Sequence, residues 1–117
     1  ALHGENLEIW GAGASLRDYL FIEDFVSGLM TLLSYGGPCQ VFNLSSGRGY
    51  SVLDIVAILR RQLGRLPEVV HLPERGFDAP VNILDPSRIH AETGWRAAVE
   101  LEDGVTRTLG WIKSLAP

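Results

Sequence analysis

The sequence has a single cysteine, Cys39, so no internal disulfide can form. A chain without disulfides is typical of a reducing compartment, and we therefore expect a cytoplasmic protein in which Cys39 is a buried free thiol. No apolar run approaches the roughly 20 residues that cross a bilayer. The first residues also lack a charged segment followed by an apolar one. The sequence therefore signals neither membrane insertion nor secretion.

Basic residues are also few, because 10 Lys and Arg face 14 Asp and Glu and leave a net charge of −4. Nucleic-acid binding depends on clustered cations that neutralise phosphates, so we expect no nucleic-acid partner. The basic cluster RRQLGR, residues 60–65, is expected to be the solvated end of a helix, where cations suit the helix dipole. The three histidines are scattered without ligand spacing, which predicts no metal site.

What the chain does have is enough apolar residues for a core: 46% of its 117 residues are hydrophobic. This length and composition predict one compact domain without a second domain or a repeat. The chain begins at Ala1 without an initiator Met, and we expect it to be part of a longer protein.

Apolar periodicity and turn residues predict a mixed α/β module. Extended segments are expected at residues 7–10, 19–22, 40–46, 68–72 and 81–84, and helices at 23–35, 52–63, 86–93 and 101–112. The first helix should bury one apolar face and the last should turn three side chains inward; these residues are Phe25, Val26, Leu29, Met30 and Leu33, and Val105, Leu109 and Ile112. Ser51 with Asp54 predicts a capping box, and Asp85 with Pro86 predicts an N-cap followed by the first helical position.

The first candidate for chemistry is Arg17, which follows the glycine-rich segment GAGAS, residues 11–15. Glycine accepts positive φ, so this segment can bend sharply and is expected to carry Arg17 in a loop between two extended pieces. A guanidinium can bind a phosphate through two parallel hydrogen bonds. The sequence therefore predicts an anion contact at Arg17. The alternative is that Arg17 only pairs with Asp18 or Asp24.

The second candidate is the segment PERGFDAP, residues 73–80, which has neither helical nor strand periodicity and is bounded by prolines. Charged residues on such a braced loop are better placed for binding than for stability. Arg75 could take the remaining oxygens of a phosphate group, and Asp78 could accept hydrogen bonds from paired hydroxyls such as a ribose diol. The alternative is that Glu74, Arg75 and Asp78 form an exposed charge cluster.

Aromatic residues give a weaker signal. Trp10 lies next to the glycine-rich segment and is predicted to be a wall of the same pocket, whereas Trp95 and Trp111 are expected in the core. Neither GAGASL nor SSGRGYS is a G-x-G-x-x-G motif or a P-loop, so neither predicts a dinucleotide or nucleoside-triphosphate site. The sequence contains no G-x-S-x-G motif either.

Four segments in order, residues 1–29, 41–59, 75–95 and 101–112, resemble the C-terminal part of the NAD-dependent sugar-nucleotide epimerase/dehydratase family. These are extended short-chain dehydrogenases typified by UDP-glucose 4-epimerase and dTDP-glucose 4,6-dehydratase. The resemblance implies that residues 1–117 are the smaller substrate-binding lobe, packed on a Rossmann domain that holds NAD. It also implies that NAD oxidises a sugar carbon and takes part in returning the hydride after inversion or loss of water. Many relatives dimerise through helices of the absent domain, so a homodimeric parent is one of the states left open.

Individual roles follow from the same resemblance. Arg17 would contact the diphosphate of a nucleotide sugar, Arg75 would meet that diphosphate from the opposite side, and Asp78 would bind the ribose. Three further family positions are expected to have structural roles in caps and turns, namely Asp24, Asn43 and Asp85.

The chain also departs from the family pattern. Ala12 stands where the glycine-loop motif usually has an acidic residue, and RGFD, with Gly76 and Phe77, replaces R-P-G-D. The catalytic Tyr-x-x-x-Lys is missing, because the residues four positions after the tyrosines are Glu23, Cys39 and Asp54. We therefore predict no catalytic and no NAD-binding residue in this chain. A non-catalytic sensor or interaction module of the same fold is the alternative, and the base, the sugar and the reaction stay open.

Overall fold

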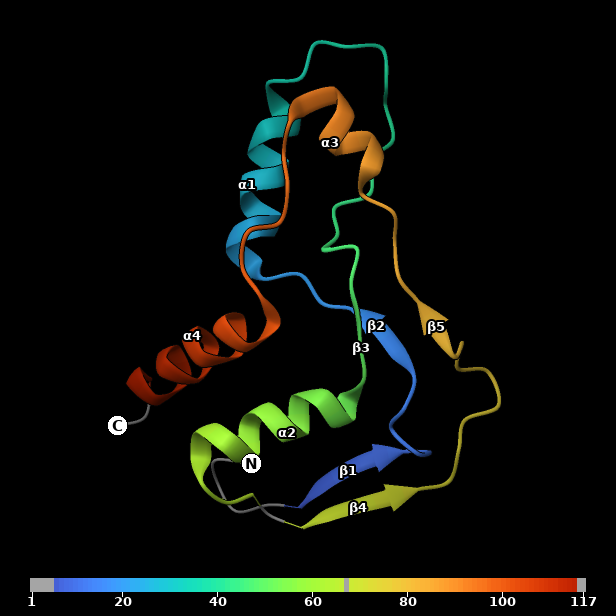
Figure 1. Cartoon of the computed structure of the whole chain (residues 1–117), viewed down its shortest axis with the longest axis vertical. Coiled ribbons are helices and arrows are strands. Elements are labelled where there is room, and N and C mark those ends of the chain that lie inside the picture. Colours follow the sequence, from blue (N-terminus) through green and yellow to red (C-terminus); the bar gives the residue numbers. More distant parts are fainter. Residues whose placement is uncertain (1–5, 67, 116–117) are drawn as a thin grey trace.

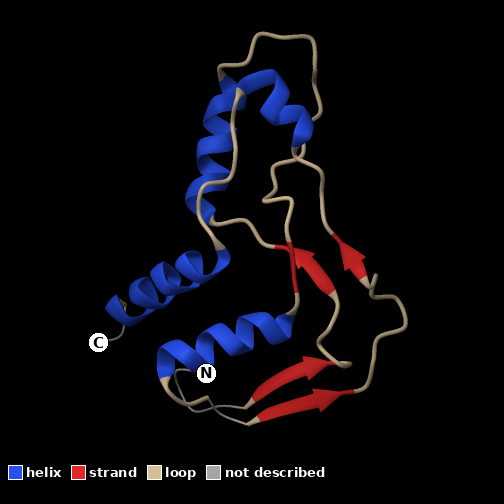
Figure 2. Ribbon diagram, in the orientation of Figure 1, coloured by secondary structure: helices blue, strands red, loops and turns tan. Residues whose placement is uncertain are grey.

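The computed structural model describes residues 6–66 and 68–115 (Figure 1). Short strands and helices are mixed along this part of the chain, which confirms the mixed α/β class (Figure 2). The elements are β1 (Leu7–Trp10), β2 (Leu16–Asp18), α1 (Ile22–Leu33), β3 (Gly49–Tyr50), α2 (Val52–Leu63), β4 (Val69–Leu72), β5 (Val81–Asn82), α3 (Ser87–Thr93) and α4 (Leu101–Ser114).

The strands form two small sheets. In one, β1 and β4 pair in parallel, with Trp10 opposite Leu72 at the end of the register. In the other the order is β3-β2-β5, where β2 is antiparallel to β3 and parallel to β5. The chain therefore pairs the same two regions twice, first through β1 and β4 and then through β2 and β5.

Helix α2 begins and ends as the sequence predicts. The Ser51 hydroxyl accepts a hydrogen bond from the Asp54 amide at 3.1 Å, and the Ser51 amide donates to the Asp54 carboxylate at 2.8 Å. These bonds confirm the capping box. The Ser51 hydroxyl also donates to the Asp54 carboxylate at 2.7 Å, and this bond, with the one from the Ser51 amide, lowers the pKa of Asp54 because both stabilise its charged form. The helix ends at Gly64, whose φ of 74° suits glycine.

Helix α1 has the predicted position but not the predicted burial. Its apolar side chains are exposed: Phe25 is 40%, Val26 50%, Leu29 42%, Met30 59% and Leu33 80% accessible. The helix instead buries Asp24 and Gly28 against the rest of the chain. The expectation that this apolar face packs into a core within the chain is wrong for the described residues, because nothing among them covers it.

Two predicted strands are absent from their predicted places. The second extended piece lies at Leu16–Asp18 rather than at 19–22, since α1 already begins at Ile22. Residues 40–46 form no strand, and several of their polar groups bond elsewhere; the Asn43 side chain donates to the carbonyl of Asp85 at 3.0 Å.

The start of α3 is shifted by one residue from its prediction. Pro86 is the N-cap and the helix begins at Ser87, although the Asp85 carboxylate still accepts hydrogen bonds from the Ser87 amide at 2.8 Å and hydroxyl at 2.9 Å. Those bonds lower the pKa of Asp85. The helix ends at Gly94 in the left-handed conformation.

The described residues have a thin core and an elongated outline. Their buried apolar side chains are Ile9, Val56, Ile58, Ile89, Trp95 and Leu109. Trp95 is thus in the core as predicted, whereas Trp111 is 62% exposed and Cys39 is only half-buried. The radius of gyration is 16.9 Å, against about 13 Å for a compact domain of this length. The chain is therefore not the compact domain that its length predicts.

No helix of the described residues is long and apolar enough to cross a membrane.

Candidate functional site

The predicted site residues lie on two stretches of chain, residues 10–17 and 72–82, which we call the paired segments. At one end the Gly11 amide donates to the Leu72 carbonyl at 2.9 Å, directly after the β1–β4 pairing. At the other end the Leu16 amide donates to the Pro80 carbonyl at 2.9 Å, where the β2–β5 pairing begins. The loop that follows β1 and the loop that follows β4 are therefore joined by a backbone hydrogen bond at each of their ends.

The glycine-rich segment bends as predicted, with φ of 66° at Gly11 and 71° at Gly13. Gly13 is buried, and a Cβ there would lie 2.9 Å from Cγ2 of Ile9 and 3.3 Å from the Leu53 side chain. A dinucleotide-binding loop needs glycine so that a pyrophosphate can approach the backbone. Here the space beside Gly13 is filled by the protein's own side chains and β2, not a helix, follows, so the loop differs from the strand–loop–helix arrangement of a dinucleotide-binding loop.

Trp10 and Arg75 are brought together by the paired segments. The guanidinium carbon of Arg75 lies 4.0 Å from the centre of the Trp10 ring, within the range of a cation–π contact. Trp10 is 48% exposed, so the pair lies at the surface. Nδ1 of His71 lies 2.8 Å from the Gly11 carbonyl and adds a further link at this end.

Arg17 lies on β2 rather than in the predicted loop. Its Nη1 donates to the carbonyl of Ala79 at 2.8 Å and to that of Leu16 at 2.9 Å. The first bond ties Arg17 to the segment that carries the other predicted residues. Asp78 precedes Ala79, and its amide donates to the Arg75 carbonyl at 3.2 Å in a turn.

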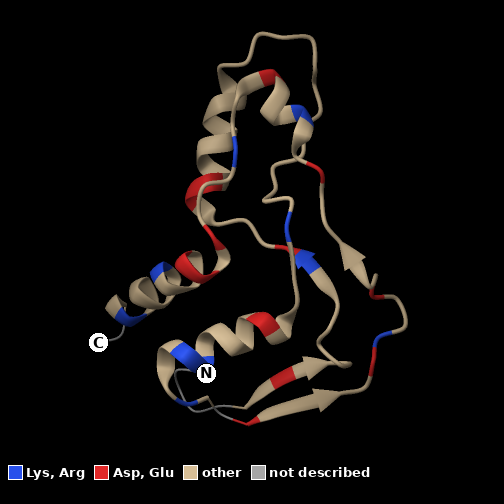
Figure 3. Cartoon of the chain, in the orientation of Figure 1, with Lys and Arg blue, Asp and Glu red and all other residues tan. Residues whose placement is uncertain are grey.

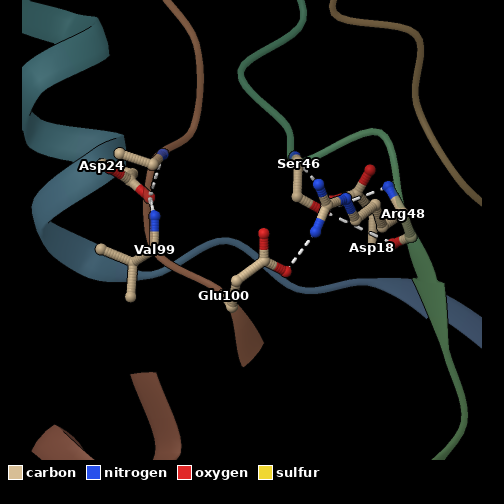
Figure 4. A network of polar contacts seen from close by, with 7 residues as sticks. Asp18, Asp24, Ser46, Arg48, Val99 and Glu100 are labelled. Carbon is tan, nitrogen blue, oxygen red and sulfur yellow. Dashed lines mark hydrogen bonds and ion pairs between the residues drawn. The ribbon is translucent and has the colours of Figure 1, made fainter. Parts of the chain in front are cut away.

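The alternative in which Arg17 pairs with Asp18 or Asp24 is wrong for the described residues, because neither carboxylate forms an ion pair with Arg17. Both carboxylates accept hydrogen bonds from other donors (Figure 4). Asp18 accepts hydrogen bonds from the amide and hydroxyl of Ser46 at 2.8 and 2.7 Å. Asp24 accepts from the amides of Ala98 at 3.1 Å and Val99 at 2.8 Å. Asp24 therefore has the structural role that was expected of it.

Residues 74–79 are all exposed, and exposure alone does not separate a binding loop from a solvated charge cluster. Two observations favour a binding loop: Arg75 lies on Trp10, and Arg17 binds the backbone next to Asp78. A solvated cluster requires neither contact. The roles of Arg17, Arg75, Asp78 and Trp10 toward a ligand stay predictions.

Residue type and loop composition identify these four residues in the sequence, but they do not reveal the contacts that join them. Segments 7–10 and 68–72 were both predicted to be extended, and pairing them in parallel would have placed Trp10 opposite Leu72, three residues before Arg75. The Arg17 contact with a backbone carbonyl leaves no signal in the sequence, because any residue at position 79 has a carbonyl.

An apolar cavity of about 310 Å³ lies elsewhere, between α2 and α4. Ile55, Leu59, Val105 and Leu109 are among the residues that line it, and none of the four predicted site residues does so. Figure 3 shows basic and acidic residues interspersed along the helices and loops of the described chain, whose full sequence has a net charge of −4. The described residues also hold no group of three or more His, Cys, Asp or Glu side chains that could bind a metal.

Comparison with known proteins gives a consistent result. Residues 1–45 match the profile of the NAD dependent epimerase/dehydratase family. The dTDP-4-dehydro-6-deoxyglucose reductase of Escherichia coli is 31% identical over 113 residues, which cover 92% of this chain and 34% of that protein.

Solved structures agree in fold along nearly the whole chain. UDP-glucose 4-epimerase of Thermotoga maritima, solved with UDP-glucose, matches with a TM-score of 0.90 at 32% identity over 97% of this chain and 37% of the other. MoeE5 in complex with UDP-glucuronic acid and NAD matches with a TM-score of 0.92 at 27% identity over 98% of this chain and 39% of the other. The chain thus spans between 34% and 39% of the length of these three proteins.

Proposed function

We propose that this chain, a part-length relative of the NAD-dependent epimerase/dehydratase family, is the nucleotide-sugar-binding part of a longer NAD-dependent sugar-nucleotide epimerase or dehydratase. Relatives of this chain include UDP-glucose 4-epimerases and dTDP-glucose 4,6-dehydratases, and similar solved structures hold UDP-glucose or UDP-glucuronic acid. The ligand class we propose is therefore a nucleoside diphosphate sugar. These relatives do not favour the non-catalytic alternative.

The observation that carries the proposal is the anchoring of Arg17 and Arg75 on the paired segments. Arg17 bonds to the Ala79 carbonyl, and Arg75 stands on Trp10 at the other end of the same loop. Neither guanidinium has a carboxylate within salt-bridge distance among the described residues. Two arginines that are positioned by the protein and free of acidic partners are suited to share a diphosphate.

The remaining residues complete the proposed contacts. Asp78, held by the turn to Arg75, would accept hydrogen bonds from the ribose hydroxyls, and Trp10 would form the wall of the pocket beneath Arg75, on the side of the diphosphate. The chain contains no Tyr-x-x-x-Lys. In this proposal the chain binds and orients the nucleotide, and the residues that perform the hydride chemistry belong to the rest of the longer protein.

We also propose that the Rossmann domain of that protein covers the exposed apolar face of α1. The chain is more extended than a compact domain of its length, and it spans only 34% of the length of the Escherichia coli reductase that it matches. Burying one Leu or Phe side chain contributes about 1.5–3 kcal/mol, so a face of five apolar residues is a substantial docking surface.

The ligand proposal is tested by calorimetry on the full-length protein with a panel of UDP-, dTDP- and GDP-sugars. Arg17→Ala and Arg75→Ala should each weaken binding by about 1.5–3 kcal/mol, the scale of a charge-assisted hydrogen bond. Arg60→Ala, at an exposed position of α2, is the matched control and should change nothing. Unchanged affinity in both test variants would refute the phosphate assignment.

A further inference from the structure

We infer that Trp10 is a positioning residue that holds Arg75 in place for the diphosphate of the nucleotide sugar. This inference rests on the proposed function, because it assigns Arg75 the diphosphate as its ligand. It adds that the arginine is arranged before the ligand arrives, and that an aromatic ring, not an acidic side chain, arranges it.

Three other arginines of the chain are arranged differently. Arg48, Arg61 and Arg107 form ion pairs with Glu100, Glu102 and Glu23, and Arg107 does so although it also lies 5.5 Å from the centre of the Phe21 ring. A carboxylate that held Arg75 in the same way would neutralise its charge and compete with phosphate for its N–H groups. A ring face instead holds a guanidinium by its flat side and leaves the N–H groups at its edge available.

The backbone around this contact is fixed on both sides. Trp10 is the last residue of the β1–β4 register, and the Gly11 amide still donates to the Leu72 carbonyl beyond it. Only two residues separate Leu72 from Arg75, so the guanidinium is carried back over the ring by a short connection. The far end of the loop is held by the hydrogen bond from Arg17 to the Ala79 carbonyl.

Preorganisation of this kind matters because an arginine loses side-chain entropy when it binds a ligand. With Trp10 in place, part of that ordering already exists in the free protein. Replacing Trp10 leaves Arg75 in the chain but makes its side chain less ordered. The replacement should therefore weaken the binding of any ligand that contacts Arg75. A role in which Trp10 itself touches the nucleoside predicts a different outcome, because its effect would not depend on Arg75.

The test is a double-mutant cycle on the full-length protein, measured by calorimetry with UDP and with uridine as probes. Trp10→Leu should weaken UDP binding about 3- to 10-fold and leave uridine binding unchanged, since uridine has no phosphate. Trp10→Phe should restore most of the affinity, because phenylalanine also offers a ring face. In an Arg75→Gln background, Trp10→Leu should have no further effect on UDP. Trp111→Leu, an exposed tryptophan on α4, is the control.

Each other result has a distinct meaning. If the wild-type protein binds no nucleoside diphosphate sugar of the panel and no UDP, the proposed function fails and this inference fails with it. If the wild-type protein binds UDP and Trp10→Leu binds it equally well, only the inference is overturned. It is also overturned if Trp10→Leu weakens uridine binding, or if its effect on UDP persists without Arg75. If Trp10→Leu does not fold, Trp10→Phe is compared with Trp10, once with Arg75 present and once in the Arg75→Gln background. Full UDP affinity of Trp10→Phe with Arg75 present supports the inference. A loss of UDP affinity that is the same in both backgrounds contradicts it.

Discussion

The paired segments and helix α1 both expose side chains, but they expose opposite kinds. The paired segments present charged groups on a backbone that is hydrogen-bonded at both ends. Helix α1 presents a row of apolar side chains and buries an aspartate on its other side. The chemistry of each surface indicates its partner, because guanidiniums suit a small anion and an apolar helix face suits another protein surface.

The inverted burial of α1 has a physical cause. Asp24 accepts two backbone amides from the segment before α4, and Gly28 lets the helix approach Trp95 and Leu44 closely. The polar side of the helix is thus its attachment to this chain, and the apolar side stays exposed, as the proposed docking of a Rossmann domain requires. The following predictions test that division, from the largest expected effect to the smallest.

The largest effect is expected from a charge on the apolar face of α1. In the full-length protein, Leu29→Asp should destabilise the fold by more than about 3 kcal/mol, because it would bury an unpaired carboxylate between two domains. Soluble yield and urea unfolding measure the effect. Ala57→Asp, at an exposed position of α2, is the control and should be close to neutral. A Leu29→Asp protein as stable as the parent would show that solvent, not a domain, covers this face.

A smaller loss is expected when the attachment of α1 is cut. Asp24→Ala removes the acceptor for the amides of Ala98 and Val99 and should lower the free energy of unfolding by about 2–3 kcal/mol. Asp24→Asn keeps one acceptor oxygen and should lose about half as much. Equal stability of all three proteins in urea would mean that α1 is held by other contacts.

The close approach at Gly28 gives the next prediction. A Cβ at this position would lie 2.5 Å from Cδ2 of Leu44 and 3.1 Å from the Trp95 ring, so Gly28→Ala should destabilise the protein by about 1–2 kcal/mol. Gly110 of α4 has no such neighbour, and Gly110→Ala should stabilise by about 0.5–1 kcal/mol. The comparison fails if both substitutions change the urea midpoint in the same direction.

The smallest effect concerns Tyr35, which follows the end of α1. Its hydroxyl donates to the Glu92 carboxylate at 2.6 Å, and this bond, with some desolvation, raises the pKa of Tyr35 to about 12. The raised pKa means that the folded protein favours the neutral phenol. The hydrogen bond therefore contributes fully to folding stability below the ordinary pKa of 10.0, and this contribution is lost as the pH rises through the folded value of about 12. Tyrosinate absorbance should show one late step that Tyr35→Phe abolishes. Simultaneous titration of all tyrosines near their ordinary pKa would contradict the contact.

Local features of the fold were predictable because their causes are local. The capping box of Ser51 and Asp54, the glycine end of α2 and the positive φ of Gly11 and Gly13 follow from neighbouring residues. Burial was not predictable in the same way. The apolar period of α1 identifies its apolar side, but it does not show whether this chain or another part of a protein covers that side.

The residues of the candidate site were predictable from the sequence, but the contacts between them were not. Arg17, Arg75, Asp78 and Trp10 were found from residue type and loop composition. Their mutual contacts depend on the pairing of β1 with β4, which joins residues about 60 positions apart, and on a bond to a backbone carbonyl. Strand pairing at that separation and bonds to main-chain atoms leave little trace in a single sequence.

The anchoring of the 73–80 loop at both ends has a consequence for how such a protein can change its ligand. Any residue inserted near Arg75 would have to bulge outward between two fixed points, lifting the arginine from Trp10 while Arg17 kept its bond to the chain. One of the two proposed phosphate contacts would then shift relative to the other with both strands unaltered. The length of this loop, more than the identity of its residues, would set the distance that a ligand must span between the two arginines.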